Sequence, residues 1–277
     1  MEDQFLTCKP APALAPYIAY YYVHQSLSQD FDKTFTYYPH FKHALTAYQH
    51  SSHCLLDDVR AEVLPNKHSS PIIYSKLQKE IGTVHLHGVF LKVGIVFQPL
   101  GIHHFIHRDY HELFPKPVNY VNCFGRDFDE VLQRVFFTEE IEDKSALLDS
   151  YFLQHKKDFS EERLKKAVQL IMESEGKISV QYLADELTMN RKTLLRLFQK
   201  HLDCSVEAYK KLVKFRLALI KIQKEKDVNL TQISSENYFD QSDFIKQFKK
   251  LTQLAPKKFL AAVTKMGSED TIWNFKD

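Results

Sequence analysis

The sequence predicts an α+β protein in which a β-rich N-terminal domain precedes an all-α C-terminal domain. Short segments dense in aromatic and β-branched residues lie between residues 17 and 120, which is typical of strands. No glycine occurs from Lys177 to Met266, where apolar residues recur at helical spacing. Charge changes with the pattern: residues 160–265 hold 21 Lys or Arg against 13 Asp or Glu, and the remaining residues hold 16 against 22. Local positive charge of this kind is expected where a protein binds a polyanion.

The bulk composition describes a soluble globular protein large enough for two domains, with 277 residues, 44% hydrophobic and 26% charged. The first residues do not resemble a secretory signal, and no apolar run is long enough to span a bilayer. The cysteines are scattered without a C-x-x-C pair, which disfavours a disulfide framework and a cysteine-ligated zinc site; they are Cys8, Cys54, Cys123 and Cys204. We therefore expect a cytoplasmic protein with no membrane partner.

The N-terminal domain should consist of strands followed by helices. Strands are expected at Tyr20–Val23, Phe35–Tyr38 and Val89–Phe97, and prolines and glycines between residues 39 and 125 would mark the turns. From Phe128 onward, apolar residues at three- and four-residue spacing indicate helices. We place the boundary at about Lys156 to Phe159. The expected division is residues 1–157 for an effector or dimerisation domain, 158–266 for the helical domain and 267–277 for a tail.

The helical domain should begin at Ser160, a good N-cap, with Gly176 ending the first helix. Beyond it, the stretch from Ile178 to Phe259 contains the same unit twice, at an offset of 50 residues. A long helix from about Val206 to Lys224 should separate the two copies, since its apolar residues keep helical spacing. The matching positions are Leu183, Ala184, Leu194, Phe198 and Tyr209 in the first copy and Ile233, Ser234, Phe244, Phe248 and Phe259 in the second, most of them apolar.

The first copy has the pattern of a helix-turn-helix unit. A scaffold helix from Val180 to Leu187 meets a turn at Thr188–Asn190, and Asn190 can cap a second helix that runs to about Lys200. Arg196 is the strongest candidate for a bidentate contact to guanine. The apolar back of the second helix is Leu194, Leu197 and Phe198, and its outward face is Arg191, Lys192, Leu195 and Arg196. Such a helix can place long donors against base edges in a major groove.

The second copy repeats this plan with different outward residues. Asn229–Gln232 resembles a capping box before its scaffold helix, and Asp240 is the expected cap of its second helix. Gln241 can pair with adenine, and Lys246 can reach guanine or a phosphate. The inward residues are Phe244 and Phe248, and the outward residues are Gln241, Ser242, Ile245 and Lys246. A connecting helix of about 19 residues would be roughly 28 Å long, which is close to the roughly 34 Å of one DNA turn.

These residues carry a resemblance to a known family. The string from Tyr238 to Lys250, with Ala255–Phe259 after it, resembles the C-terminal signature of the AraC/XylS family of bacterial transcription regulators. The first copy also matches that family, from Leu183-Ala184 through Arg196 to Ser205 and Tyr209. The resemblance implies a DNA-binding domain of two helix-turn-helix subdomains joined by a helix, which controls transcription initiation near a promoter.

The sequence departs from the family pattern at four positions where glycine is usual. Thr188, Asp203, Asn237 and Gln253 occupy those places, and the second turn is one residue shorter than usual. Asn and Asp tolerate the left-handed backbone conformation that such glycines serve, so two of the substitutions are mild. The shorter second turn affects the expected tilt of the second recognition helix.

Regulators of this family commonly carry an N-terminal effector or dimerisation domain, often a cupin-like barrel. Pro12–Ile18 and Phe97–Gly101 resemble one group of such sensor domains, which implies a cupin-like, β-rich sensor here. Aromatic residues on the expected strands can line a ligand pocket or form the core; they are Tyr20, Tyr22, Phe35, Tyr37, Phe90 and Phe97.

Histidines are concentrated in the N-terminal domain, where 13 of the 14 lie. On a strand, His85 and His87 would share a face; on a helix, His103, His107 and His111 would stack. This spacing permits a metal site with neutral imidazole ligands. No carboxylate recurs beside these histidines at ligand spacing, so we expect polar surface residues, with no metal and no cofactor. A metal-dependent cupin-type enzyme is thus the less favoured alternative.

The function predicted is sequence-specific DNA binding in transcription regulation, with α-helices that read two successive major grooves. Double-stranded DNA is the expected partner, together with RNA polymerase at the promoter. The sequence leaves open whether a small-molecule effector exists and whether the chain forms a homodimer. A helical interaction module that binds no DNA is the third alternative, because two amphipathic hairpins can simply build a core.

Overall fold

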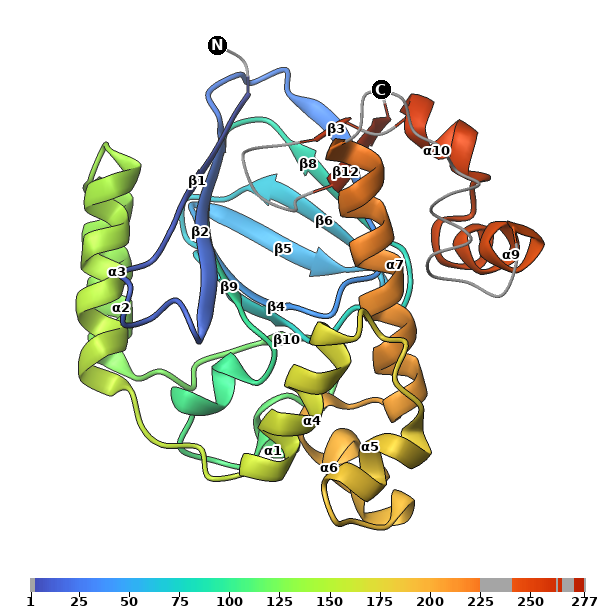
Figure 1. Ribbon diagram of the computed structural model, residues 1–277. Coiled ribbons are helices and arrows are strands. Elements are labelled where there is room, and N and C mark those ends of the chain that lie inside the picture. The colour runs from blue at the N-terminus through green and yellow to red at the C-terminus, as the bar shows by residue number, and fades with distance from the viewer. Residues whose placement is uncertain (1–2, 225–240, 263, 266–271, 277) are drawn as a thin grey trace.

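In the part of the chain that the structure describes, the N-terminal domain is built on two six-stranded β-sheets, one of which includes two strands from the C-terminal residues, and helices make up most of the C-terminal domain (Figure 1). The computed structural model describes residues 3–224, 241–262, 264–265 and 272–276. This arrangement confirms the predicted α+β class, with a β-rich region first and a helical region after it. Within the described residues, no helix combines the length and apolar character needed to cross a membrane.

The first sheet has the strand order β1-β2-β9-β4-β7-β10, and all its pairs are antiparallel. Helices α2 and α3 cover its outer face, as Figure 1 shows on the left. Phe128 of α2 and Phe152 of α3 are fully buried there against Ile95 and Phe97 of β9. The elements are β1 (Gln4–Cys8), β2 (Ile18–Ser26), β4 (His43–Gln49), β7 (Ile72–Ser75), β9 (Phe90–Phe97), β10 (Val118–Tyr120), α2 (Arg126–Phe137) and α3 (Ile141–His155).

The second sheet has the order β11-β12-β3-β8-β6-β5. Its inner face packs on the first sheet, because Phe35, Val63 and Leu86 share a buried cluster with Tyr48 and Phe90. The pair β6–β8 is parallel and the other pairs are antiparallel. The strands are β3 (Asp32–Tyr37), β5 (Ser51–Leu55), β6 (Arg60–Pro65), β8 (Gly82–His87), β11 (Thr264–Lys265) and β12 (Ile272–Lys276).

The C-terminal helices are arranged around the long helix α7 (Val206–Lys224), whose bounds are those predicted. The first helix begins one residue later than expected: its N-cap is Glu161 rather than Ser160, whose carbonyl oxygen instead accepts from the Glu162 amide. The helix ends at Glu173 with Ser174 as C-cap; Glu175 (φ 52°) is the first left-handed residue after it, and the predicted Gly176 (φ 75°) follows, its amide donating to Ile171 O. The remaining helices are α4 (Glu162–Glu173), α5 (Val180–Glu186), α6 (Arg191–Leu202), α9 (Gln241–Thr252) and α10 (Pro256–Ala262).

Helix α7 packs on both halves of the helical domain. Its first part, including Tyr209 and Val213, is buried with α4, α5 and α6. Its second part, including Phe215 and Leu219, is buried with Phe248 of α9 and its neighbours. One continuous helix therefore fixes the positions of α6 and α9, and Figure 1 shows α6 beyond the lower end of α7 and α9 beside its upper half.

The two domains pack closely against each other. Phe41, Leu77 and Leu100 of the N-terminal domain belong to the buried cluster of the first helical unit, and Tyr38 belongs to that of the second. At the C-terminal end of the chain, β12 pairs with β3, so that the last strand joins the N-terminal domain's sheet.

A buried arginine holds α7 to the N-terminal domain. Arg216 is 3% exposed, and its Nε and Nη2 donate hydrogen bonds of 2.6 Å each to the carbonyl oxygens of Pro39 and Tyr38. These carbonyl groups follow β3. Because buried carbonyl groups need hydrogen-bond donors, the guanidinium stabilises both the end of this strand and the position of α7.

Replacing Arg216 by Met should lower the free energy of unfolding by about 3 kcal/mol, because two charge-assisted hydrogen bonds to carbonyl groups are lost. Lys211 of the same helix is exposed and supplies the matched control. Lys211→Met should change the free energy of unfolding by less than about 0.5 kcal/mol. Urea denaturation followed by helical circular dichroism measures both variants. Equal midpoints for Arg216→Met and Lys211→Met would show that the contact contributes little.

Candidate nucleic-acid interface

The first helix-turn-helix unit consists of α5 and α6. Side chains cap both helices: Ser179 accepts from the Tyr182 amide at 3.0 Å, and Asn190 accepts from the Thr193 amide at 2.8 Å. The predicted cap at Asn190 is thus confirmed. Leu194 and Phe198 on the back of α6 are fully buried. These contacts fix the pose of α6 before any DNA is bound.

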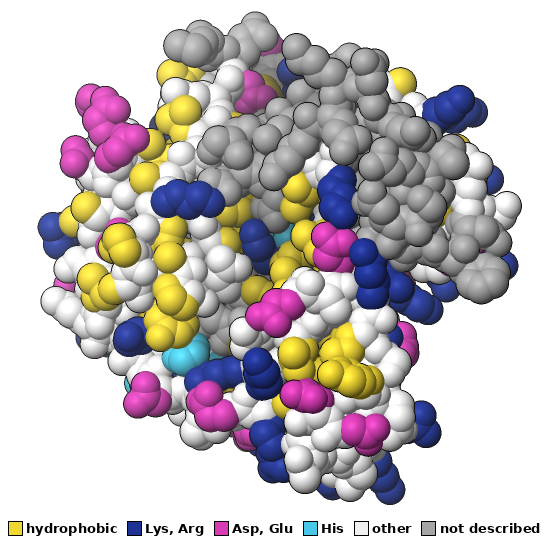
Figure 2. Space-filling model, in the orientation of Figure 1, with side chains coloured by type: hydrophobic (Ala, Val, Ile, Leu, Met, Phe, Trp, Pro, Cys, Tyr) yellow, Lys and Arg dark blue, Asp and Glu magenta, His cyan; other side chains and the backbone are white. Residues whose placement is uncertain are grey.

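The outward face of α6 is accessible along its N-terminal half. Arg191, Lys192 and Arg196 are exposed, and Leu195 is partly exposed. Figure 2 shows several Lys and Arg side chains around the foot of the molecule, where α5 and α6 lie. The opposite end of α6 faces the N-terminal domain, so the end that carries these donors is the one left open. Their contact with DNA stays a prediction.

Helix α9 presents a comparable face. Phe244 and Phe248 are fully buried, as predicted. Gln241, Ser242 and Lys246 are exposed, and Ile245 is 39% exposed. The expected cap at Asp240, the capping box at Asn229–Gln232 and the turn at Asn237 lie outside the described residues.

The glycine replacements adopt the conformation that glycine would favour. Thr188, Asp203 and Gln253 have φ of 49°, 54° and 57°, all in the left-handed region. The Thr188 amide donates to Asp185 O and the Met189 amide to Ala184 O, so the turn closes α5 by hydrogen bonds. For Thr188 this conformation is strained because its side chain is β-branched.

Two of the histidines contact α6 instead of forming a helical stack. The helix on which His103, His107 and His111 would stack does not form: a short 3-10 helix (Gly101–His104) ends before α1 (Tyr110–Leu113) begins. Asp109 caps α1 through the His111 amide, which separates the two segments.

These histidines donate to the C-terminal end of α6. His103 Nε2 donates to His201 O and His111 Nε2 to Gln199 O, each at 2.9 Å. Burial lowers the pKa of His103 to about 4, so its imidazole stays neutral. These contacts could not be predicted from local sequence patterns, because the partners lie 98 and 88 residues apart in the chain.

A second contact between the domains involves a lysine. Lys76 is 3% exposed and its Nζ lies 3.2 Å from Oδ2 of Asp203, the residue that caps the end of α6. Lys79 also reaches Asp203. Asp203, which stands where glycine is usual in the AraC/XylS pattern, therefore joins α6 to the N-terminal domain by an ion pair with Lys76.

A cavity of about 180 Å³ lies between the two sheets and reaches the domain junction. Four of the six aromatic residues proposed for a pocket line it, namely Tyr20, Tyr22, Phe35 and Tyr37. Phe90 and Phe97 belong to the buried core instead, because their side chains point into apolar clusters on either side of the first sheet.

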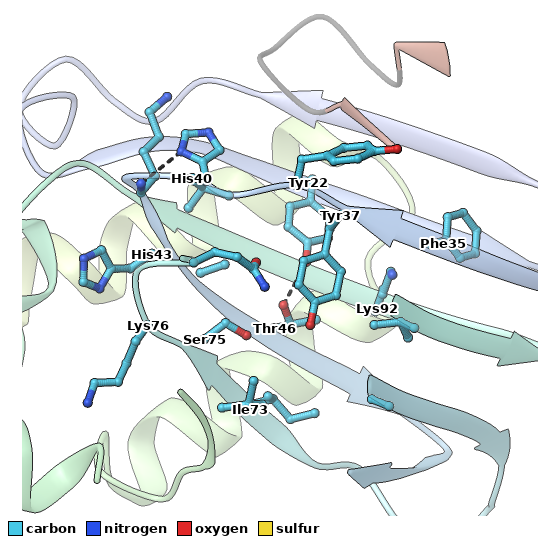
Figure 3. A pocket seen from close by; sticks show the side chains of 18 of the residues that line it. Tyr22, Phe35, Tyr37, His40, His43, Thr46, Ile73, Ser75, Lys76 and Lys92 are labelled. Atoms are coloured by element: carbon cyan, nitrogen blue, oxygen red, sulfur yellow. Dashed lines mark hydrogen bonds between the residues drawn. The ribbon is translucent and has the colours of Figure 1, made fainter. Parts of the chain in front are cut away.

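Basic side chains lie at both ends of this cavity. In Figure 3 the rings of Tyr22 and Tyr37 lie between Lys92 at one end and His43 and Lys76 at the other. Lys92 is 3% exposed, and burial lowers the pKa of its amine to about 7. Arg216 also lines the cavity, so the residue that holds α7 contributes to its wall.

Comparison with known proteins agrees with the helical pattern. Residues 183–262 match the family model described as a helix-turn-helix domain. No curated protein sequence matches the chain significantly. The structure is similar to ToxT from Vibrio cholerae, with 14% identity, a TM-score of 0.45 and coverage of 94% of this chain and 97% of that one.

Two further structures give comparable or lower similarity. Unsaturated-fatty-acid-bound wild-type ToxT from Vibrio cholerae strain SCE256 has 13% identity and a TM-score of 0.46, over 97% of this chain and 98% of that one. The C-terminal domain of AraT, a response regulator from Geobacillus stearothermophilus, has 21% identity and a TM-score of 0.34, over 39% and 88%. The match of residues 183–262 to the helix-turn-helix family model is based on sequence, and this match, not the structural similarities, bears on function.

Replacing Thr188 by Gly should stabilise the first unit. Relief of the left-handed strain, about 1–2 kcal/mol, exceeds the extra backbone entropy that glycine loses on folding, about 0.5–1 kcal/mol. We expect the free energy of unfolding to rise by about 0.5–1 kcal/mol. Thr193→Gly, inside α6, is the control, and this substitution should lower the free energy of unfolding by a similar amount. A loss of stability in Thr188→Gly would refute the strained conformation.

Proposed function

We propose that this chain, a DNA-binding transcription regulator whose residues 183–262 form a helix-turn-helix domain of the AraC/XylS type, reads two successive major grooves of promoter DNA. One observation carries this proposal: α6 and α9 each have a buried apolar back and an exposed polar face, and both pack on α7. With 19 residues, α7 is roughly 28 Å long, a separation suited to adjacent grooves.

The two helices should read different bases. On α6, Arg196 is assigned to guanine, with Arg191, Lys192 and Leu195 beside it at the DNA surface. On α9, Gln241 suits adenine and Lys246 suits a phosphate or guanine, flanked by Ser242 and Ile245. A wholly structural role for the hairpins explains their apolar backs but leaves the recurrence of exposed donors in both units without a reason.

The remaining partners follow from this role. A regulator that controls initiation changes how RNA polymerase engages the promoter, so RNA polymerase is the second macromolecular partner. Promoter binding places the protein in the bacterial cytoplasm. Because one chain carries two reading helices, two-groove recognition does not need a homodimer, and a homodimer would extend the operator. No catalytic step is assigned to the chain.

The cavity between the sheets is the proposed effector site. Its walls are aromatic and its ends carry Lys92 and Lys76, which suits a small apolar molecule with an anionic group. Arg216 and Tyr38 line the same cavity and make the contact that holds α7. An effector that prefers one position of α7 would thereby change the geometry of both recognition helices, to the extent of its differential affinity.

Selection of bound fragments from genomic DNA tests the proposed function directly. A regulator enriches a common sequence, whereas a helical interaction module that binds no DNA enriches none.

Within an enriched site, Arg196→Ala should cost about 1–3 kcal/mol and relax the base preference at one position. Lys246→Ala, if its contact is to phosphate, should weaken all sites alike and reduce the salt slope by about 1. Competition binding on specific and random DNA at several salt concentrations separates the two effects. Equal losses for Arg196→Ala on both DNAs would contradict base reading.

The effector site predicts pH-dependent binding of a probe anion. 2-Naphthoate should bind more tightly than the neutral 2-naphthalenemethanol, and its affinity should fall as the pH rises from 6 to 9. The direction of this pH dependence follows from Lys92. Burial lowers the pKa of its amine to about 7, and the nearby charge of Asp3 offsets only part of that effect. The amine is charged below that pH, and a bound anion favours the charged form. His24 and His53, which face Lys92, have a pKa of about 4 because of burial and stay neutral throughout.

Calorimetry with wild type and Lys92→Met gives the measurement and its control. The variant should lose both the preference for the anion and the pH dependence. Retention of both in Lys92→Met would assign the anion to another group.

A further inference from the structure

The outer face of the second sheet carries a group of metal-binding side chains from neighbouring strands. His85 and His87 lie two residues apart on β8 and so share a face. Asp32 of β3 is paired with His87 in the register, and Glu62 of β6 is paired with His85 on the other side. Their inward neighbours, among them Leu86 and Val63, are buried in the core. The four polar side chains therefore gather on one outward surface.

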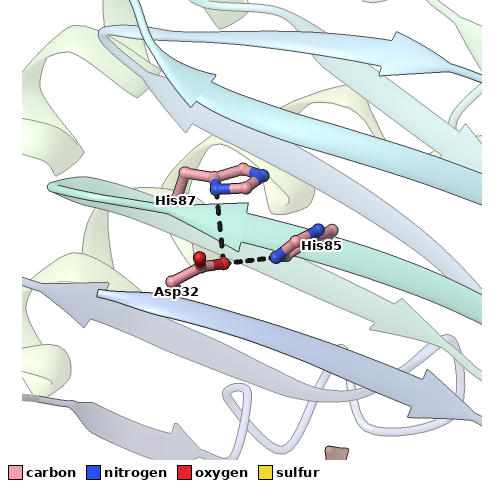
Figure 4. Close-up of side chains that lie close together, drawn as sticks. All are labelled: Asp32, His85 and His87. Carbon is pink, nitrogen blue, oxygen red and sulfur yellow. Dashed lines mark hydrogen bonds and ion pairs between the residues drawn. The ribbon is translucent and has the colours of Figure 1, made fainter. Parts of the chain in front are cut away.

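Three of these side chains converge on a common point, as Figure 4 shows. His85 Nε2 contacts Asp32 Oδ1, and His87 Nδ1 lies 3.4 Å from the same oxygen. All three ligand atoms lie within 4.8 Å of one another. The two imidazole centroids are 3.9 Å apart. Ligands on a tetrahedral ion with metal bonds of about 2.0–2.1 Å lie roughly 3.4 Å apart, and His87 Nδ1 and Asp32 Oδ1 have that separation.

The other nitrogen of His87 has its own acceptor. His87 Nε2 lies 3.1 Å from Oε1 of Glu62. A histidine that binds a metal through one nitrogen commonly donates its other N–H to a carboxylate, which fixes the tautomer and the ring orientation. Glu62 therefore leaves Nδ1 of His87 with a lone pair directed toward Asp32. This is the arrangement of a metal ligand with a positioning residue behind it.

We propose that Asp32, His85 and His87 bind a divalent transition-metal ion, with Zn²⁺ matching the donor set of two imidazoles and one carboxylate. In such a site the ion replaces the proton that His85 Nε2 would otherwise share with Asp32 Oδ1. Asp32 is exposed and both histidines are partly exposed, which leaves a fourth position for water or another small ligand. Mg²⁺, which prefers six oxygen ligands, does not suit this site.

The ion would connect β3 to β8, next to the edge of β3 that pairs with the C-terminal strand β12. One edge of β3 pairs with β8, which carries both histidines, and its other edge pairs with β12. A metal bound to Asp32 and the two histidines would therefore cross-link β3 to β8 in the folded state. Because the ligands come together only on folding, binding should raise the melting temperature.

Titration of the tag-free full-length chain with ZnCl₂ tests the site. Calorimetry should give one ion per chain with a dissociation constant in the micromolar range, and MgCl₂ should give none. Asp32→Asn, His85→Gln and His87→Gln should each weaken binding by at least about 100-fold, and Glu62→Gln by about 10-fold. Cobalt substitution supplies an independent reading, since visible absorption bands of Co²⁺ bound by nitrogen and oxygen should disappear in the same variants.

Two control variants exclude adventitious binding. His68 and Cys54 are exposed side chains outside the site, and Cys54 lies opposite Glu62 in the register. His68→Gln and Cys54→Ala should bind Zn²⁺ as the wild type does. Circular dichroism in the absence of metal should show that every variant is folded, as expected of substitutions at partly exposed positions. Zinc binding that survives Asp32→Asn and His85→Gln, or no binding by the wild type, would overturn the proposal.

Discussion

The hydrogen bonds from Arg216 to the carbonyl oxygens of Tyr38 and Pro39 are the constraint on which the relative placement of the parts depends. Arg216 belongs to α7, and among the described residues α7 packs on both α6 and α9. Holding this helix against the end of β3 therefore fixes α6 and α9 together. The ion pair of Lys76 with Asp203 and the hydrogen bond from His103 to α6 act at the other end of the same interface. The open face of α6 is left exposed because these contacts use its C-terminal end.

The cavity, the contact of Arg216 with the end of β3 and the proposed metal site all involve the N-terminal domain. The cavity lies between the two sheets, and Arg216 and Tyr38, which make that contact, also line it. The proposed metal ligands lie on the outer face of the second sheet. One of them, Asp32, belongs to β3, which also pairs with β12. Strand β3 is thus the element common to all three. A shift of β3 would therefore change both the wall of the cavity and the hydrogen bonds from Arg216 of α7.

The parts that could be predicted from the sequence depend on local patterns. The bounds of α7, the Asn190 cap and the buried faces of α6 and α9 follow from apolar spacing and capping preferences within a few residues. The contacts between domains could not be found this way, because Arg216 lies 177 residues from Pro39. The metal ligands were discounted for the same reason: the carboxylates of Asp32 and Glu62 are 53 and 25 residues from their histidine partners. The helical stack of His103, His107 and His111 was wrong because the capped start of α1 interrupts it.

We propose that one chain holds two recognition helices at the spacing of adjacent major grooves. Hydroxyl-radical footprinting on a selected DNA site measures this spacing most directly. We expect two protected segments on one face of the DNA, with centres about 10 base pairs apart. A single protected segment, or two segments on opposite faces, would contradict it.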